Sequence, residues 1–148
     1  ASIINVTSAE EMLEAVKKNR ADIEIYVAAV ADWRVKDVAN QKLKKHAGQT
    51  EMNITFIQNP DILAHAGENK DNRLIIGFAL ETEDIIENAH TKLNKKNADL
   101  IIANDNSSFG ADNSNVTFVS HNNNTDFGNI SKAQLASNLV EWIEKLSS

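Results

Sequence analysis

The sequence contains no cysteine, one proline and five glycines among 148 residues. The absence of cysteine excludes disulfides, thiolate metal sites, iron–sulfur clusters and cysteine nucleophiles. The longest apolar run, Ile25–Ala31, has seven residues, whereas a membrane-spanning helix needs about 20. The first residues also lack the basic and apolar regions of a secretory signal peptide. We therefore expect a cytoplasmic protein without a membrane segment.

The glycines never lie close together, so the chain has neither a G-x-G-x-x-G turn nor a Walker A motif. A dinucleotide or P-loop site built by this chain alone is therefore not expected, and a redox domain that binds NAD(P) or flavin is disfavoured. The four histidines show no metal-ligand spacing, which argues against a histidine-held metal. No G-x-S-x-G elbow is present either.

Positive charge is also scarce, with 15 Lys and Arg against 21 Asp and Glu and a net charge of −6. A protein that binds nucleic acid through the phosphate backbone needs a basic face, so we expect no nucleic-acid partner. The hydrophobic fraction of 42% and the charged fraction of 24% are typical of a globular protein. The length predicts a single domain over residues 1–148.

Strand and helix patterns alternate along the chain. β-branched or alternating runs predict strands at 2–6, 23–30, 52–57, 73–79, 98–103, 116–120 and 125–127. Apolar stripes behind capping residues predict helices at 8–19, 59–69, 83–97 and 131–146. The alternation predicts an α/β class, a Rossmann-like three-layer fold with a mostly parallel sheet flanked by helices.

The sequence also predicts burial, caps and core residues for individual elements. The continuous apolar character of 23–30 indicates a strand covered on both faces. Ser8 with Glu11, and Ser131 with Gln134, match the capping box. Asn59 and Thr82 are predicted to cap their helices. The residues predicted to face the core are Ile85, Ile86, Ala89 and Leu93 in one helix and Leu135, Leu139, Trp142 and Ile143 in the last.

Ligands of open α/β sheets bind at the carboxyl ends of the strands, which makes Ala28–Trp33 the first candidate site. Small residues let a flat ring approach the backbone there, and Asp32 can accept from an amine or a ribose hydroxyl. A buried strand that simply ends in an aspartate explains the pattern equally well.

A second candidate is the lysine cluster at 42–45, because an anion such as a triphosphate would relieve the mutual repulsion of three cations in an acidic protein. A solvated surface run is the commoner origin of such a cluster.

Two helix features complete the candidates. The helix start at Asn59–Ile62 offers free N–H groups to a phosphate, although plain capping explains it as well. Lys92 and Lys96 lie one turn apart and share a helix face. Late lysines are also what the helix dipole favours. Phe78, at a strand end, is more often a core residue than a ligand residue. Glu81 and Asp105 follow strand ends, where acids can hold Mg²⁺ but are also common.

The order and spacing of these motifs together resemble the bacterial phosphopantothenate–cysteine ligase over essentially the whole chain. The matching segments are Ala-Ala-Val-Ala-Asp-Trp (28–33), Lys-x-Lys-Lys (42–45), Asn-Pro-Asp-Ile (59–62), Gly-Phe-Ala-x-Glu-Thr (77–82), Lys-x-x-Lys-Lys-Asn (92–97), Ala-Asn-Asp (103–105) and Phe-Gly-Ala-Asp (109–112). The resemblance implies a reaction that uses CTP and Mg²⁺ to convert 4′-phosphopantothenate to an acyl-cytidylate, which cysteine then attacks. It also implies a homodimer and a flavin-dependent decarboxylase domain upstream.

The resemblance also implies roles for individual residues. Lys42 would be the catalytic residue, at the head of a loop that closes on the triphosphate or the intermediate. The resemblance assigns no residue to metal binding. The nucleotide-binding residues would be Tyr26, Val27, Ala28, Asp32, Lys42, Pro60, Asp61, Ile62, Leu63, Phe78, Lys92 and Lys96.

The resemblance departs at the front of the chain. Members of the family begin with a strand, a Gly-Gly-Thr-x-Glu-Pro-like turn and a further glycine-containing stretch, and none of these is present. We therefore expect a C-terminal portion of the ligase domain. The alternative is a catalytically incomplete fragment that binds the nucleotide without turning it over.

Overall fold

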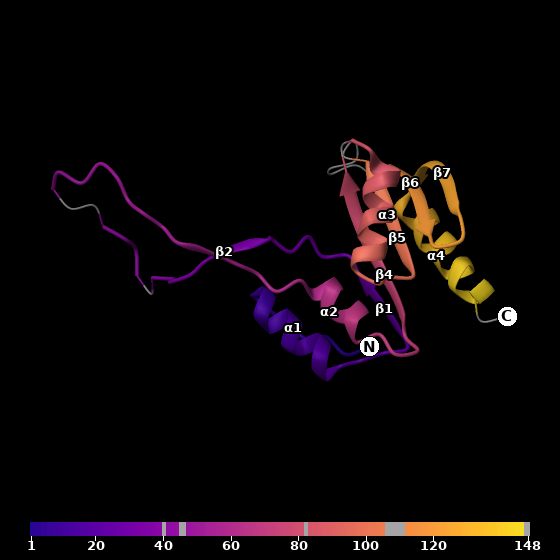
Figure 1. Cartoon of the computed structure of the whole chain (residues 1–148), viewed down its shortest axis with the longest axis horizontal. Coiled ribbons are helices and arrows are strands. Elements are labelled where there is room, and N and C mark those ends of the chain that lie inside the picture. Colours follow the sequence, from indigo (N-terminus) through magenta and orange to yellow (C-terminus); the bar gives the residue numbers. More distant parts are fainter. Residues whose placement is uncertain (40, 45–46, 82, 106–111, 147–148) are drawn as a thin grey trace. The chain divides into compact units, whose positions relative to one another are not determined.

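The computed structural model describes residues 1–148 except 40, 45–46, 82, 106–111 and 147–148. The described elements are, in chain order, α1 (Ala9–Lys18), β1 (Ile23–Tyr26), β2 (Trp33–Val35), β3 (Phe56–Gln58), α2 (Ile62–Glu68), β4 (Leu74–Glu81), α3 (Ile85–Lys95), β5 (Leu100–Asp105), β6 (Asn113–Ser120), β7 (Asn124–Ser131) and α4 (Lys132–Leu146) (Figure 1). The chain packs as two compact units, residues 1–20 with 28–62, and residues 21–27 with 63–148. The assignment of one domain to the chain stays a prediction.

The second unit is built on a five-stranded sheet of order β1-β4-β5-β6-β7. The strands β1, β4 and β5 are parallel, whereas β6 and β7 form an antiparallel hairpin at the other side. Hydrophobic clusters cover both faces of this sheet. The predicted α/β class with a Rossmann-like layered fold is thus confirmed, and the parallel part of the sheet is the one that carries the crossover helix α3.

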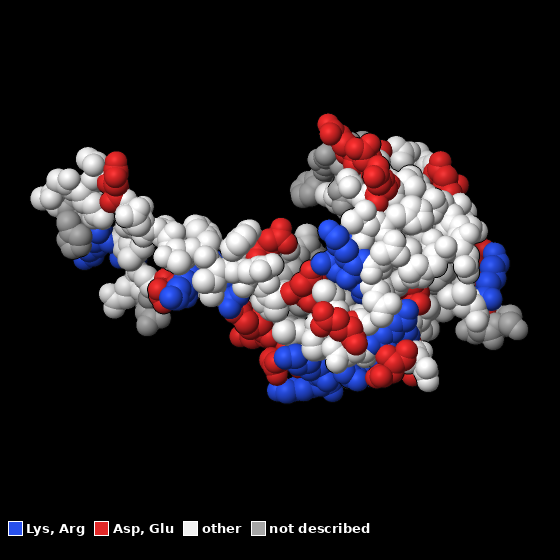
Figure 2. Space-filling view, viewed as in Figure 1, with Lys and Arg blue, Asp and Glu red and all other residues white. Residues whose placement is uncertain are grey.

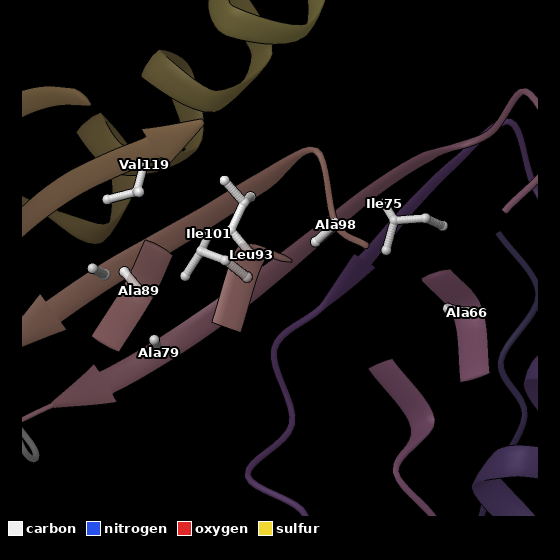
Figure 3. Close-up of a cluster of buried hydrophobic side chains, with 9 residues drawn as sticks. Ala66, Ile75, Ala79, Ala89, Leu93, Ala98, Ile101 and Val119 are labelled. Carbon is white, nitrogen blue, oxygen red and sulfur yellow. The ribbon is translucent and has the colours of Figure 1, made fainter. Parts of the chain in front are cut away.

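Two clusters of buried side chains hold the layers together. One joins α2 and α3 to the sheet and consists of Ala66, Ile75, Ala79, Ala89, Leu93, Ala98, Ile101, Ala103 and Val119 (Figure 3). The other lies on the face covered by α4 and consists of Ile76, Leu100, Ile102, Val116, Phe118 and Leu139. The many alanines of the first cluster let helices approach the sheet closely, because a small side chain keeps the backbones near one another.

The capping boxes of α1 and α4 are present. At α4 the Ser131 hydroxyl accepts from the backbone N–H of Gln134 at 3.2 Å, and the Gln134 amide oxygen accepts from the N–H of Ser131 at 2.9 Å. At α1 the Ser8 hydroxyl accepts from the N–H of Glu11 at 3.1 Å. The predicted core stripe of α4 is also confirmed, since Leu139 is buried and Leu135, Trp142 and Ile143 pack beside it.

The prediction for residues 23–30 was wrong in length and in burial. The strand ends at Tyr26, and only the face that carries Glu24 and Tyr26 is covered. The side chains of Ile23 and Ile25, on the opposite face, are 42% and 46% exposed. The reason is position, because β1 is the outermost strand on its side of the sheet and an apolar sequence does not report that. Residues 2–6, also predicted as a strand, form no strand in this fully described segment.

Two other elements differ from the prediction. No strand was predicted between residues 30 and 52, yet β2 forms there and pairs antiparallel with β3 in the register Trp33 to Gln58. Helix α2 begins at Ile62, so Asn59 does not cap it. The Asn59 side-chain amide instead donates to the Ala31 carbonyl at 2.7 Å, which joins the chain just before β2 to the chain just after β3. The Asn59 side chain is therefore used in a tertiary contact and not as a helix cap.

Helix α3 starts later than predicted. Thr82, the predicted cap, lies outside the described residues. The residue before the helix is Asp84, which has φ of 46° and makes no side-chain cap bond. Ala89 and Leu93 are buried as predicted and Ile85 packs beside them, but Ile86 is 38% exposed, so its placement in the core was wrong. The predicted apolar stripe of this helix included one residue too many, because Ile86 lies at the edge of the face that packs on the sheet.

The remaining elements follow the predicted order. The strands predicted at 98–103 and 116–120 are β5, which continues to Asp105, and β6, which begins at Asn113. Residues 106–111 lie outside the description. The predicted short strand 125–127 is part of the longer β7. In the described part of the chain, none of the helices combines the length and the apolar character that a bilayer crossing demands.

Candidate functional site

The second unit brings β1, β4 and α2 together at Gly77. In the parallel register, Tyr26 is the last residue of β1 and lies opposite Gly77 of β4. A Cβ atom at Gly77 would come within 2.7 Å of Leu63 Cδ2 and 2.9 Å of Ile101 Cδ1. Only glycine therefore lets the start of α2 lie directly against this part of the sheet. Tyr26 and Leu63, both predicted as site residues, pack against the same buried cluster.

The Tyr26 hydroxyl is engaged within the unit. It donates to Glu24 Oε2 at 2.6 Å, while Glu24 Oε1 accepts from Arg73 Nη1 at 2.5 Å and from the N–H of Ala21 at 3.2 Å. Burial, together with the hydrogen bond to Glu24, raises the pKa of Tyr26 well above its ordinary value. Tyr26 is thus a neutral donor at any physiological pH, and its hydroxyl is directed to a protein carboxylate.

Glu24 is the buried anion of this group. Burial would raise the pKa of Glu24, but the hydrogen bonds from Tyr26, Ala21 and Arg73 outweigh it and lower that pKa below its ordinary value. Both partners of the ion pair are largely enclosed, with side-chain exposures of 8% for Glu24 and 11% for Arg73. A buried charge is tolerated when its oxygens are hydrogen-bonded, and here both carboxylate oxygens are.

Lys92 and Phe78 meet just past the end of the β1–β4 pairing. The Lys92 ammonium donates to the Phe78 carbonyl at 2.8 Å. The ring of Phe78 packs on the other face of the sheet, against the cluster covered by α4. An ammonium has three donors, so Lys92 can hold this carbonyl and still donate to an anion. Lys96 is the C-cap of α3, and its N–H donates to the Lys92 carbonyl at 2.9 Å.

The C-terminal end of α3 is joined to α2 at Gly67. Asn97 Nδ2 donates to the Gly67 carbonyl at 2.8 Å. A Cβ atom at Gly67 would overlap the Lys96 carbonyl, so the two helices approach as closely as their backbones allow. Asn97 has φ of 48°, the left-handed conformation in which asparagine commonly ends a helix. The Lys70 ammonium bonds the carboxylate of Asp99 at 2.6 Å in the same region.

The first unit holds the predicted residues around Asp32 and Pro60. The N–H of Asn59 donates to the Asp32 carbonyl at 2.7 Å, and Arg34 Nη1 donates to the Gln58 carbonyl at 2.6 Å. These bonds place Asp32 beside the segment that leads into Pro60, Asp61 and Ile62. The carboxylate of Asp32 is exposed, whereas Ile62 is 4% exposed. A backbone-rich corner with two exposed acidic residues, Asp32 and Asp61, can accept from a hydroxyl or an amine.

Lys42 lies in the segment that connects β2 to β3. The N–H of Lys36 donates to the Thr55 carbonyl at 2.9 Å, which closes the base of this segment. Between these two residues the chain runs out as two extended legs without a helix or strand in its described part (Figure 1). Lys42 and Lys44 are exposed on it, while Lys45 and His46 lie outside the described residues.

The remaining predicted residues lie where the chain passes from one unit to the other. Val27 ends the segment 21–27 of the second unit, and Ala28 begins the segment 28–62 of the first unit. Val27 is 61% exposed. The Ala28 carbonyl accepts from the N–H of Val30 at 3.1 Å. The predicted residues are therefore gathered in two groups, one within each unit.

No group of three or more potential metal-ligating side chains is found among the described residues. Asp105, at the end of β5, instead accepts from Asn115 Nδ2 at 2.6 Å. On the face drawn in Figure 2, basic side chains are interspersed with acidic ones.

The comparison with protein families decides the identification. Residues 1–146 match the model described as the DNA/pantothenate metabolism flavoprotein C-terminal domain. The chain belongs to this family. The predicted resemblance is thereby confirmed, because the family match covers residues 1–146 and relatives in it are named for coenzyme A biosynthesis.

Two curated relatives and one solved structure illustrate the family. The chain is 48% identical over 105 residues to the coenzyme A biosynthesis bifunctional protein CoaBC of Vibrio vulnificus, covering 69% of this chain and 26% of that protein. It is 40% identical over 146 residues to the protein of the same name from Haemophilus influenzae, covering 95% of this chain and 36% of that protein. The crystal structure of the C-terminal domain of a CoaBC protein superposes with a TM-score of 0.75 at 33% identity, over 97% of this chain and 66% of that chain.

The chain thus spans about a quarter to a third of the curated relatives it matches. Within this family domain, several structural residues escaped the sequence analysis. Glu24 stands alone in an apolar strand and Gly67 stands alone in a helix, and both are signals of a tertiary constraint. Their partners, Arg73 and Asn97, carry no signal of their own, because the pairings depend on contacts between separate elements.

Proposed function

We propose that this chain forms part of the phosphopantothenate–cysteine ligase domain of coenzyme A biosynthesis. One observation carries the proposal. Predicted residues from separate segments, Tyr26, Leu63 and Lys92, converge around Gly77 and Phe78 at the carboxyl end of β1 and its pairing with β4. This is the edge at which α/β sheets bind their ligands. The curated relatives, which are named for coenzyme A biosynthesis, support the same conclusion.

In the proposed reaction the carboxylate of 4′-phosphopantothenate attacks the α-phosphorus of CTP. The bond from that phosphorus to the bridging oxygen breaks, and pyrophosphate leaves with the electron pair. The amine of cysteine then attacks the acyl carbon of the acyl-cytidylate, CMP leaves, and the amine proton is lost to solvent. No protein nucleophile is required, so the protein contributes by positioning its ligands and stabilising charge.

The proposed roles follow from where the residues lie. Backbone groups of Tyr26, Val27 and Ala28 would read the cytosine edge, because the Tyr26 hydroxyl already donates to Glu24. Asp32 would accept from the ribose. Lys92 and Lys96 would bind the phosphates, and Lys42 would act on the triphosphate or the intermediate. The remaining proposed nucleotide-binding residues are Pro60, Asp61 and Ile62 of the first unit and Leu63 and Phe78 of the second.

The proposed need for Mg²⁺ rests on the triphosphate rather than on a protein site. Mg²⁺ usually keeps several waters and binds through substrate phosphates with one or two carboxylates. The described residues do not fit a dedicated metal site, because no three ligating side chains gather there.

The proposed partners are CTP, 4′-phosphopantothenate and cysteine, a second copy of the chain in a homodimer, and a flavin-dependent decarboxylase domain in the longer protein. The test is a pyrophosphate-release assay on the longer protein that contains this chain. Release should require CTP, 4′-phosphopantothenate and Mg²⁺, and the ligated product should form only when cysteine is added. CTP binding without any turnover would favour a nucleotide-binding fragment, and turnover with ATP but not CTP would contradict the proposal.

A further inference from the structure

A junction at the C-terminal end of α3 holds the part of the helix that carries Lys92 and Lys96. Three contacts make this junction. Asn97 Nδ2 donates to the Gly67 carbonyl at 2.8 Å, the Gly67 backbone lies against the Lys96 carbonyl, and Lys70 Nζ reaches the Asn97 carbonyl at 3.5 Å. All of these residues lie in the second unit, so the junction is a contact within one compact body.

The junction joins the two helices that carry the proposed phosphate site. Helix α2 begins beside Leu63, which lies over Gly77, and it ends near Gly67. Helix α3 carries Lys92, whose ammonium holds the Phe78 carbonyl at 2.8 Å, and is followed by Lys96 and Asn97. A shift of α3 along or around its axis would therefore move Lys92 and Lys96 relative to Leu63. The Asn97–Gly67 bond opposes that shift, because it ties the end of one helix to the backbone of the other.

We propose that Asn97 is a positioning residue for the nucleotide, which sets the placement of Lys92 and Lys96 through its hydrogen bond to Gly67. This inference rests on the proposed function and adds a residue that touches no ligand. Asparagine suits the position for two reasons, since it tolerates the left-handed backbone and supplies an amide donor. Glycine meets only the first of these requirements.

That difference provides the test. In the full-length protein, Asn97→Gly keeps the left-handed backbone and removes the amide donor. Asn69→Ala is the matched control, because Asn69 Nδ2 also donates to a backbone carbonyl at 2.8 Å, that of His65, but within α2. Each variant loses one hydrogen bond of similar geometry, so both should lower the melting temperature by similar amounts.

Only Asn97→Gly should change the kinetics with respect to CTP. We expect its KM for CTP to rise about five-fold, the equivalent of one hydrogen bond's net contribution, while kcat and the KM for cysteine stay near the unmodified values. Asn97→Asp, which keeps the size and the left-handed tolerance but replaces the donor with an acceptor, should give the same split and serves if Asn97→Gly folds poorly.

The outcomes separate the two proposals. If the unmodified protein turns over CTP and both Asn97 variants match Asn69→Ala in KM for CTP, the positioning role is overturned and the ligase function survives. If kcat falls and KM for CTP does not rise, the positioning role is overturned as well. If the unmodified protein neither binds nor turns over CTP, the proposed function itself fails and the inference falls with it.

Discussion

The ammonium of Lys92 lies 2.8 Å from the carbonyl oxygen of Phe78 and donates a hydrogen bond to it. This bond connects the third turn of α3 to β4, one residue beyond the point where β1 stops pairing with that strand. The lysine thereby has a structural role that exists without any ligand. Its effect on stability and its effect on anion binding can be measured separately.

Replacing Lys92 by glutamine should affect both properties. Loss of the charge-assisted bond to Phe78 should lower the free energy of unfolding by about 1.5–3 kcal/mol, measured by denaturant titration. Loss of the cation should raise the KM for CTP about ten-fold, since a phosphate contact is removed, and should flatten its dependence on salt. Lys95→Gln, an exposed lysine of the same helix, is the control. Equal effects of the two substitutions on KM would contradict the assignment of Lys92.

The contact between Gly77 and Leu63 predicts a coupled pair of substitutions. Gly77→Ala places a methyl group 2.7 Å from Leu63 Cδ2, so we expect a loss of about 1–3 kcal/mol in the free energy of unfolding. Leu63→Ala removes the atoms that the methyl group would meet. In a double-mutant cycle the two changes should therefore cost less together than the sum of the single changes. Strict additivity would show that α2 does not lie against β4 at this point.

The Glu24 network predicts how stability depends on acid pH. The pKa of Glu24 is lowered in the folded protein from its ordinary value of 4.5. Its contribution to stability is therefore fully present above about pH 4.5 and is lost as the pH falls through the folded value. Denaturant titrations between pH 3 and 7, roughly spanning the ordinary carboxyl range, should show a shallower acid loss for Glu24→Gln than for the unmodified protein. Parallel curves would disprove this linkage.

Tyr26 predicts a loss of stability at alkaline pH, whereas Glu24 predicts a loss at acid pH. Burial and the bond to Glu24 raise its pKa above the ordinary value of 10.0, so its contribution is fully present below that pH and is lost as the pH rises toward the folded value. Tyr26→Phe should abolish this alkaline loss. It should leave CTP affinity nearly unchanged, because the hydroxyl faces Glu24 rather than the proposed ligand. A large loss of CTP binding on calorimetric titration would show that the hydroxyl contacts the nucleotide.

Lys42 tests the proposed role of the segment that connects β2 to β3. The side chain is exposed, so Lys42→Gln should leave the melting temperature within about 1 °C, as is usual for surface substitutions. In the full-length protein we expect turnover to fall about a hundred-fold or more, which is typical of losing one group that stabilises transition-state charge. Lys18→Gln, on exposed α1, is the control. Turnover near that of the control would remove Lys42 from the catalytic step.

Local signals predicted a large part of the fold. Helix α4 followed from Ser131, Gln134 and an apolar stripe because the capping box and the 3.6-residue period are properties of the segment itself. The same is true of α1. The three-residue strand β2 escaped because so short a segment has no measurable period, and it forms only when β3 lies beside it. The exposure of Ile23 and Ile25 escaped because it depends on the place of β1 in the sheet.

The site divides in the same way. Lys92 and Lys96 were predicted from helix spacing, and Asp32 from a strand end that the structure places at Tyr26 instead. Glu24–Arg73 and Gly67–Asn97 were not predicted, because each pair joins residues from different elements. Such contacts depend on the packing of the fold, and no local pattern reports them.

The central claim is that CTP binds where β1 ends beside β4, facing the lysines of α3. Hydrogen–deuterium exchange of the full-length protein with and without CTP measures this most directly, because bound ligand protects the backbone amides around it. The account predicts slower exchange in peptides covering 26–32, 60–66 and 77–79, and at 92–97, with the hairpin of β6 and β7 unchanged. Protection confined to that hairpin, or no change at the four predicted segments, would contradict it.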